Sequence, residues 1–164
     1  MTEARIRLLQ GMAIFGGIED AILEFLLARS PVVRVPKGEF FFRQDERGES
    51  MFVLEDGKVA VLKRWQEGDC LLRILERGDC FGEMALMDFF PRSASVLAVE
   101  DCVAIELSAA RLHELYEMDP RQFAMIEMNM GREVSRRLRE SDERLFRASM
   151  GAADAGADYV FRAG

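Results

Sequence analysis

The chain has 164 residues, of which 49% are hydrophobic and 31% are charged, values typical of a soluble globular protein with a single core. No apolar run reaches the roughly 18 residues of a membrane span, and residues 1–10 carry charge where a signal peptide would be apolar, so we expect a cytoplasmic protein. The net charge of −7 argues against non-specific binding to polyanions such as DNA.

Residues 1–30 are expected to form two helices. In the second, the residues at positions 18, 21, 22, 25 and 26 are apolar, which is the spacing of an amphipathic helix. The Gly16-Gly17 pair marks the break between the two helices. We therefore assign residues 1–30 to an N-terminal helical lead.

Residues 31–107 have the pattern of an all-β domain. Glycines beside polar residues, typical of turns, recur at positions 38, 48, 57, 68 and 78. Between them lie short runs rich in Val, Phe, Leu and Ile, at residues 39–43, 51–54, 59–65 and 70–75, and residues 94–107 hold two more. Strands separated by turns about every ten residues indicate a mainly β fold, either a sandwich or a small barrel, with helices at both ends.

From Ser108 the pattern becomes helical again. Ser108 can cap a short helix, and Asp119-Pro120 is the start signal of a second one. We expect the second helix to run to about Arg147 and assign residues 108–148 to C-terminal helices. Residues 149–164 are mostly Ala, Gly and Asp, which predicts a flexible tail.

The second of these helices is also a candidate dimer interface. Four of its residues have the 4-3-4 spacing of a coiled-coil seam: Val134, Leu138, Ser141 and Leu145. We expect a homodimer through residues 120–147, because the seam extends beyond the probable edge of the β domain. The alternative is a helix that packs only on its own β domain.

The chain offers little for metal binding or catalysis. Cys70, Cys80 and Cys102 form neither an even set nor a CxxC pair, so we expect no disulfide framework, zinc site or iron–sulfur cluster. The single histidine, His113, cannot supply the several histidines of a cupin-type metalloenzyme and has no specific Ser or Cys partner for catalysis. We therefore expect no metal, no catalytic residue and no enzyme activity.

Residues 81–96, FGEMALMDFFPRSASV, interrupt the strand pattern and hold the candidate binding site. Residues 83–87 can form a short helix, whose N-terminal N–H groups favour an anion. Gly82 lacks a Cβ atom, so a ligand can approach the backbone there.

Two charged residues frame this stretch. Arg92 supplies a planar fork for two oxygens of one phosphate, with the N–H groups of Ser93 and Ala94 beside it. Glu83 can only accept hydrogen bonds, for example from a sugar hydroxyl. These residues fit a pocket for a small phosphate with a nearby hydroxyl, but a Glu83–Arg92 ion pair that closes a loop fits the spacing equally well.

The same stretch resembles the phosphate-binding cassette of the cyclic nucleotide-binding domain family, found in bacterial catabolite activators and in regulatory subunits of cyclic-AMP-dependent kinase. The family pattern is Phe-Gly-Glu, two apolar or small residues, a short helix and Pro-Arg-(Ser/Ala/Thr)-Ala. Phe81–Ala85 and Pro91–Ala94 meet it. The resemblance covers most of the chain and implies a jelly-roll β-barrel over residues 31–107, with the cassette at residues 81–94.

The resemblance also implies a role for individual residues. Arg92 would hold the cyclic phosphate, helped by the backbone N–H groups of Ser93 and Ala94. Glu83 would accept a hydrogen bond from the ribose 2′-hydroxyl, beside Gly82 and Met84. The implied base pocket consists of five residues: Val61, Leu72, Phe81, Ser141 and Asp142.

The residues expected near the base leave its identity open. Ser141-Asp142 follows Arg136–Leu138 at the family's spacing, but Asp142 departs from the Thr-Ser pair of the catabolite activators. Asp142 could accept from the amino group of adenine or the edge of guanine, or it could simply be solvated. In the family, a hydroxyl at the position of Ser93 occurs in cyclic-AMP sites and in related domains contacts guanine. Cyclic AMP is the favoured ligand and cyclic GMP the alternative.

The resemblance therefore implies a non-enzymatic sensor that repositions its C-terminal helix and acts on an unidentified downstream protein. A ligand-free dimerisation module that retains the fold is the alternative from a different class. Only 17 residues follow Arg147, too few for a helix-turn-helix, so we expect no DNA binding by this chain, unless it is a piece of a longer regulator.

Overall fold

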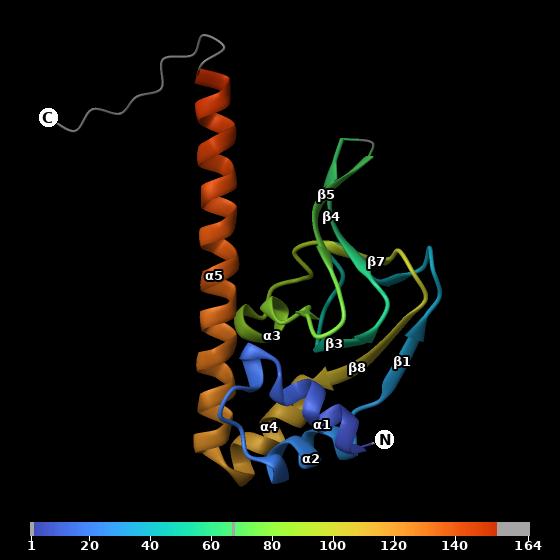
Figure 1. Ribbon diagram of the computed structural model, residues 1–164, viewed down its shortest axis with the longest axis vertical. Coiled ribbons are helices and arrows are strands. Elements are labelled where there is room, and N and C mark those ends of the chain that lie inside the picture. The colour runs from blue at the N-terminus through green and yellow to red at the C-terminus, as the bar shows by residue number, and fades with distance from the viewer. Residues whose placement is uncertain (1, 67, 154–164) are drawn as a thin grey trace, which may run out of the picture. The chain divides into compact units, whose positions relative to one another are not determined.

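The computed structural model describes residues 2–66 and 68–153 (Figure 1). The chain divides into two units, Met1–Met130 and Gly131–Gly164. The first unit contains all the strands and most of the helices, and the second contains the greater part of the last helix. Of the predicted tail, residues 154–164 lie outside the described residues.

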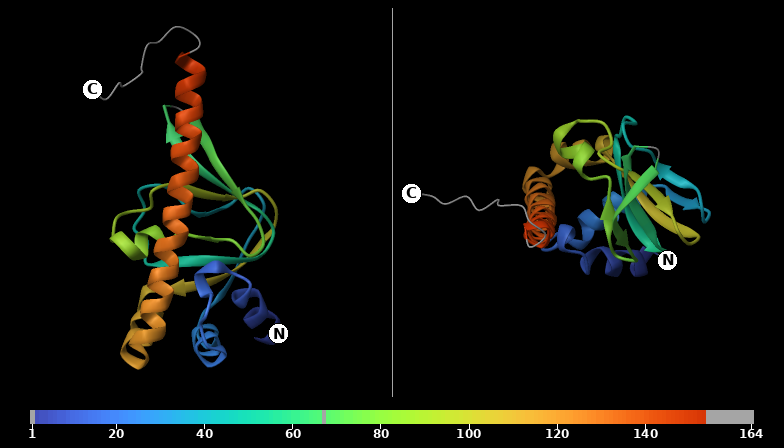
Figure 2. Two further views of the ribbon diagram at one scale, coloured as in Figure 1. Left: turned by 60° about the vertical axis from the view of Figure 1, so that its left-hand side comes forward. Right: turned by 90° about the horizontal axis from the view of Figure 1, so that it is seen from above.

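The N-terminal segment is helical, as its pattern predicts. Helix α1 (Thr2–Gln10) is followed by a single 3₁₀ turn, η1 (Ala13–Phe15), and then by helix α2 (Asp20–Ala28). Together with α4, these helices lie at one end of the strands, as both Figure 1 and Figure 2 show.

Eight strands form two antiparallel sheets. They are β1 (Val32–Val35), β2 (Phe40–Phe42), β3 (Ser50–Asp56), β4 (Val59–Trp65), β5 (Gly68–Leu75), β6 (Cys80–Phe81), β7 (Ser95–Ala98) and β8 (Cys102–Ser108). The strand orders are β1-β8-β3-β6 and β2-β7-β4-β5. The mainly β jelly-roll class with flanking helices is thus confirmed. The predicted closure into a barrel is wrong for the described chain, because no ladder of hydrogen bonds joins the two sheets.

Strand β3 is buried on both of its faces. Met51 and Val53 face a core made with α1, α2, α4 and the first turns of α5. Phe52 and Leu54 alternate with them and face a second core, which lies between the two sheets. The result is a run of apolar residues without the polar alternation of a half-exposed strand.

The remaining helices are α3 (Met84–Asp88), α4 (Ala109–Met118) and α5 (Pro120–Ala153). Both predicted caps are present. The Ser108 hydroxyl accepts a hydrogen bond from the Arg111 N–H group at 3.2 Å. The Asp119 carboxylate accepts from the N–H groups of the second and third residues of α5, at 3.0 and 3.1 Å. The described part of helix α5 extends to Ala153, beyond the predicted end near Arg147. Over the described residues, no helix combines the length and the hydrophobicity that crossing a bilayer requires.

We predict that Asp119→Ala lowers the free energy of unfolding by about 1 kcal/mol, because two N–H groups at the start of α5 lose their acceptor. Urea unfolding measures this difference. The matched control is Glu24→Ala, which removes an exposed carboxylate from α2 and should leave stability nearly unchanged. Equal losses in the two variants would show that Asp119 does not act as a cap.

Candidate functional site

Residues 81–94 connect the two sheets through α3. The segment begins on β6, where Phe81 pairs with Phe52 of β3, and it ends just before β7. Gly82 has a φ of +83°, and a Cβ atom there would lie 2.6 Å from Nη1 of Arg92. Glycine is therefore required at this position both for the backbone conformation and for the approach of Arg92.

Arg92 is folded back against the start of the segment. Its side chain is buried, with 5% of the residue exposed, and Nη1 donates a hydrogen bond to the Gly82 carbonyl at 2.9 Å. The guanidinium carbon lies 4.0 Å from the centre of the Phe42 ring, a cation–π contact. The Arg92 backbone donates to the Glu46 carbonyl at 2.8 Å and accepts from the Asp45 N–H group at 2.9 Å. The loop between β2 and β3 therefore holds Arg92 in place.

The guanidinium of Arg92 retains hydrogen-bonding capacity. Its Nε atom is buried and has no hydrogen-bond partner among the described residues. Burial lowers the pKa of Arg92 from its ordinary value, and the negative charges of Glu106, Glu46 and Glu83 act in the opposite direction. A buried donor without an acceptor is costly, so an anion that reached Nε would be stabilised there.

Glu83 is also buried, with 3% of the residue exposed, and lies directly before α3. Its carbonyl accepts hydrogen bonds from the N–H groups of Leu86 and Met87 at 3.0 and 3.3 Å. The Arg92 guanidinium is hydrogen-bonded to the Gly82 carbonyl, and the negative charge of Glu83 is close enough to act on it. A loop-closing attraction between Glu83 and Arg92 therefore stays an alternative to a ligand-binding role for the two side chains.

The other predicted phosphate-site residues lie close to this pair. The Ser93 hydroxyl is 3.8 Å from the sulfur of Met84, and the Ser93 carbonyl accepts from the ammonium group of Lys63 on β4 at 2.5 Å. Ala94 is buried just before β7. The structure thus brings together the six predicted residues: Gly82, Glu83, Met84, Arg92, Ser93 and Ala94.

The predicted base-pocket residues in the first unit differ in exposure. Val61 on β4 is half-buried, and Leu72 on β5 is 45% exposed. Phe81 is only 2% exposed and packs among Phe41, Phe42 and Phe52, with its ring stacked on Phe52 at 5.4 Å. Phe81 therefore supports the segment from beneath and offers little surface to a ligand.

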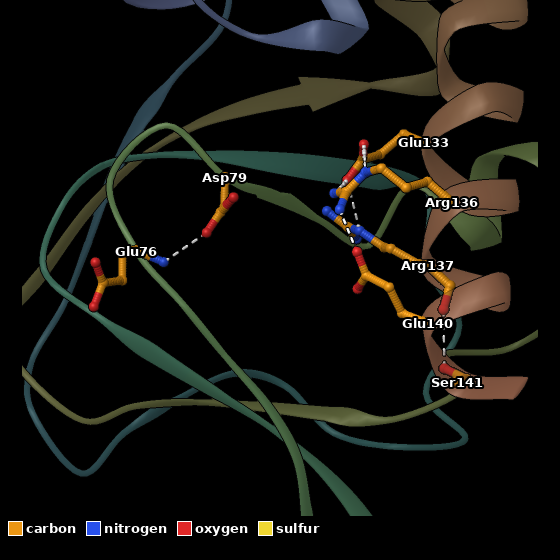
Figure 3. Close-up of polar contacts among 7 residues, drawn as sticks. All are labelled: Glu76, Asp79, Glu133, Arg136, Arg137, Glu140 and Ser141. Carbon is orange, nitrogen blue, oxygen red and sulfur yellow. Dashed lines mark hydrogen bonds and ion pairs between the residues drawn. The ribbon is translucent and has the colours of Figure 1, made fainter. Parts of the chain in front are cut away.

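Ser141 and Asp142 belong to the second unit, where both are exposed. The Ser141 hydroxyl donates to the Arg137 carbonyl at 3.0 Å, as drawn in Figure 3. Glu133, one turn before Arg137, forms ion pairs with Arg136 at 2.7 Å and with Arg137 at 2.9 Å. Burial acts to raise the pKa of the Glu133 carboxyl, but these two arginines outweigh it and lower the pKa. This helix surface is therefore stabilised by its own ion pairs.

The turn before β6 is fixed by its own side chain. The carboxylate of Asp79 accepts a hydrogen bond from the Glu76 N–H group at 2.9 Å (Figure 3). The Gly78 N–H group and the Asp79 carbonyl bond to the backbone of Leu54 on β3, each at 2.9 Å. These bonds set the position at which the chain enters β6 and then the candidate site.

Several residues of the site were missed by sequence reasoning. Gly48 was recognised only as a turn glycine, but a Cβ atom there would lie 2.4 Å from Nε of Arg92. Phe42 was assigned to a strand, and its contact with the guanidinium was not predicted. Ser95, whose hydroxyl accepts from the Gln44 N–H group at 2.8 Å, and Lys63 were likewise not predicted. All four act through contacts between distant segments, for which the local sequence holds no signal.

Residues 32–119 match the sequence profile of the family described as "Cyclic nucleotide-binding domain". The match extends over more than half of the chain. The chain belongs to the cyclic nucleotide-binding domain family. Domains of this family are regulatory sensors, and the described residues contain no cluster of side chains suited to a metal ion.

Individual relatives agree with this family. The chain is 30% identical over 135 residues to the cyclic AMP receptor protein of Thermus thermophilus, an alignment that covers 82% of this chain and 61% of the receptor. It is 37% identical over 91 residues to a cGMP-dependent protein kinase of Toxoplasma gondii, covering 56% of this chain and 9% of the kinase. The chain thus spans about three fifths of the length of the receptor and a small part of the kinase.

Among solved structures, a cyclic nucleotide-binding domain from Methylobacillus flagellatus superposes on this chain with a TM-score of 0.80. The superposition covers 90% of this chain and 83% of that one, at 22% sequence identity. At this level of identity the similarity shows a shared fold.

We predict that Gly48→Ala lowers the free energy of unfolding by about 1–3 kcal/mol, because the new methyl group overlaps the Arg92 guanidinium. Chemical denaturation measures the loss. The control is Gly68→Ala, since a Cβ atom at Gly68 has no neighbour within 4 Å. Unchanged stability in Gly48→Ala would mean that Arg92 does not need its observed position.

Proposed function

We propose that this domain binds a cyclic nucleotide at residues 81–94, with cyclic AMP as the favoured ligand, and that it transmits the bound state through its C-terminal helices. The observation that carries the proposal is the buried Arg92 guanidinium, whose Nε atom has no acceptor among the described residues. A site of this kind is suited to one small anion held at a fixed position.

The phosphate would lie between Arg92 and the start of α3. The fork of Arg92 would bind two phosphate oxygens, and the backbone N–H groups of Ser93 and Ala94 would donate to the remaining acceptors. The cation–π contact with Phe42 and the hydrogen bond to the Gly82 carbonyl support this assignment, because they leave Nε for the ligand.

The ribose would lie beside Glu83. An ionised carboxylate accepts hydrogen bonds only, so it suits a hydroxyl group of a sugar. Gly82, next to it, presents only backbone, which allows the sugar ring to approach. The base would then contact Val61 and Leu72 on the neighbouring strands β4 and β5, with Ser141 and Asp142 as further candidates.

Cyclic GMP is the alternative ligand. The Ser93 hydroxyl supports it, since this group bonds only weakly to the Met84 sulfur and could turn toward a guanine amino group. One relative of the chain is named a cGMP-dependent kinase, whereas another is named a cyclic AMP receptor. A direct comparison of the two nucleotides is therefore the decisive measurement.

We expect calorimetry to detect binding of cyclic AMP, with weaker binding of cyclic GMP. Arg92→Ala should weaken binding by at least about 2 kcal/mol, which is roughly a 30-fold increase in the dissociation constant. Arg92→Lys keeps the charge but loses the fork, so it should also weaken binding. Arg34→Ala, which removes an exposed arginine from β1, is the matched control and should bind normally.

Each outcome has a definite meaning. Absence of heat with both nucleotides would contradict the sensor function and favour a ligand-free dimerisation module. Binding that survives in both Arg92 variants would contradict the phosphate assignment alone. Tighter binding of cyclic GMP would reverse the order of the two ligands.

Transmission would involve the start of α5. Ile126 and Met130 are fully buried in the core that also contains α1, α2 and α4, so the first turns of α5 are anchored in the first unit. Nucleotide binding would favour one of two positions of the helix from Pro120 onward, in proportion to its affinity for each. An unidentified downstream protein would respond to this change.

The second unit is the proposed dimer interface. Leu138 and Leu145, which are seven residues apart on α5, are 59% and 68% exposed. Apolar residues at this spacing are typical of a coiled-coil seam. A second copy of the helix would cover them.

We predict that the chain sediments as a dimer and that Leu138→Asp combined with Leu145→Asp converts it to a monomer. Placing two carboxylates in the seam removes apolar contact and adds repulsion between the copies. The matched control makes the same apolar-to-Asp change at Phe146 and Met150, which are 58% and 46% exposed and lie outside the seam. Sedimentation velocity distinguishes the species, and a monomeric wild type would contradict the interface.

A further inference from the structure

A groove with a volume of about 410 Å³ lies between three helices of the first unit. Its wall is formed by α3 and the residue that ends it, by α4, and by the first turns of α5. Most of the residues that line it are hydrophobic. The full lining consists of Leu86, Phe89, Ala109, Leu112, His113, Tyr116, Phe123 and Glu127. None of them is assigned to the nucleotide.

Large aromatic side chains surround this groove. Phe89 is 87% exposed and Tyr116 is 50% exposed. Tyr116 packs edge-to-face against Phe123 at 5.4 Å, so the aromatic wall of the groove is ordered. Exposed aromatic residues gathered around a hollow are characteristic of a surface that a partner covers.

One carboxylate lies in this apolar wall. Burial raises the pKa of Glu127 above its ordinary value. No described residue donates a hydrogen bond to its side chain or forms an ion pair with it. His113, which also lines the groove, has its Nε2 atom 3.6 Å from the carboxylate of Glu117. A partly buried carboxylate of this kind is stabilised when a cation or a hydrogen-bond donor reaches it.

We propose that this groove is a docking site for an amphipathic helix of a partner protein, with a lysine or arginine on its apolar face that pairs with Glu127. Helices bind such grooves through apolar anchors at i, i+3 or i+4, and i+7. The basic residue follows from charge complementarity, and the net charge of −7 would attract a basic partner as well. The exposed aromatics favour a protein over a small molecule, because they extend the apolar surface beyond the hollow itself.

The groove also offers a route from the nucleotide to the partner. Leu86 and Phe89 come from the segment between Glu83 and Arg92, so a nucleotide that moves this segment would change one wall of the groove. This part of the inference rests on the proposed function. By reciprocity, a helix in the groove would change nucleotide affinity by the same factor.

The test uses two synthetic helical peptides of about 18 residues, which is five helical turns. Both carry leucines at helical spacing on one face, and one has a central lysine where the other has a glutamate. Fluorescence anisotropy measures their binding to the full chain. We expect the lysine peptide to bind at least 10-fold more tightly than the glutamate peptide.

Reversing the charge of the groove should reverse this preference. Glu127→Lys is expected to bind the glutamate peptide more tightly than the lysine peptide, whereas Glu39→Lys, a charge reversal in an exposed turn, should behave as wild type. A bulky Ala109→Phe side chain, which fills the groove, should weaken both peptides. Equal binding of the two peptides, absent binding, or a preference unchanged in Glu127→Lys would overturn the docking site.

The coupling to the nucleotide is tested separately. Saturating cyclic AMP should change the affinity for the lysine peptide at least 3-fold in wild type and leave it unchanged in Arg92→Ala. An unaffected wild type that binds the nucleotide would overturn the coupling while the docking site stands. A chain that binds the peptide but no nucleotide would contradict the proposed function alone.

Discussion

The buried guanidinium of Arg92 is the group on which the arrangement of the first unit's loops depends. A cation can be buried only where hydrogen bonds and nearby charge compensate for lost hydration, and here these come from separate segments. The Gly82 carbonyl, the Phe42 ring and the charge of Glu106 belong to three different parts of the chain. The position of one side chain therefore ties β2, the segment around α3 and β8 together.

Two glycines make this arrangement possible, and they do so differently. Gly82 adopts a backbone conformation that other residues rarely adopt, and Gly48 provides space where any side chain would overlap Arg92. The loss of hydration on burying Arg92 is still not fully compensated, since Nε remains without an acceptor among the described residues. Under the proposed function, an anionic ligand at Nε would complete this compensation, and ligand binding would then stabilise these loops.

The elements that could be predicted are those whose signals are local. The caps Ser108 and Asp119 were predicted because capping involves residues within one turn, and the longer strands because turn glycines delimit them. Strands β1 and β6 were not predicted, since they have four and two residues and depend on pairing with β8 and β3. The same limit applies to the site: its motif was recognisable, whereas the contacts of Phe42 and Gly48 with Arg92 exist only in the folded chain.

Strand β3 has a consequence for how the first unit can change. Successive residues of β3 point alternately into the helical core and the inter-sheet core. Because both cores share this backbone, a change in the packing of one core moves side chains of the other. Phe52 contacts Phe81 at the start of the candidate site, and Met51 and Val53, on either side of it, contact the helical core. We expect the amide hydrogens of β3 to exchange among the slowest in the unit. The strand should therefore stay rigid while the loops and helices around it move.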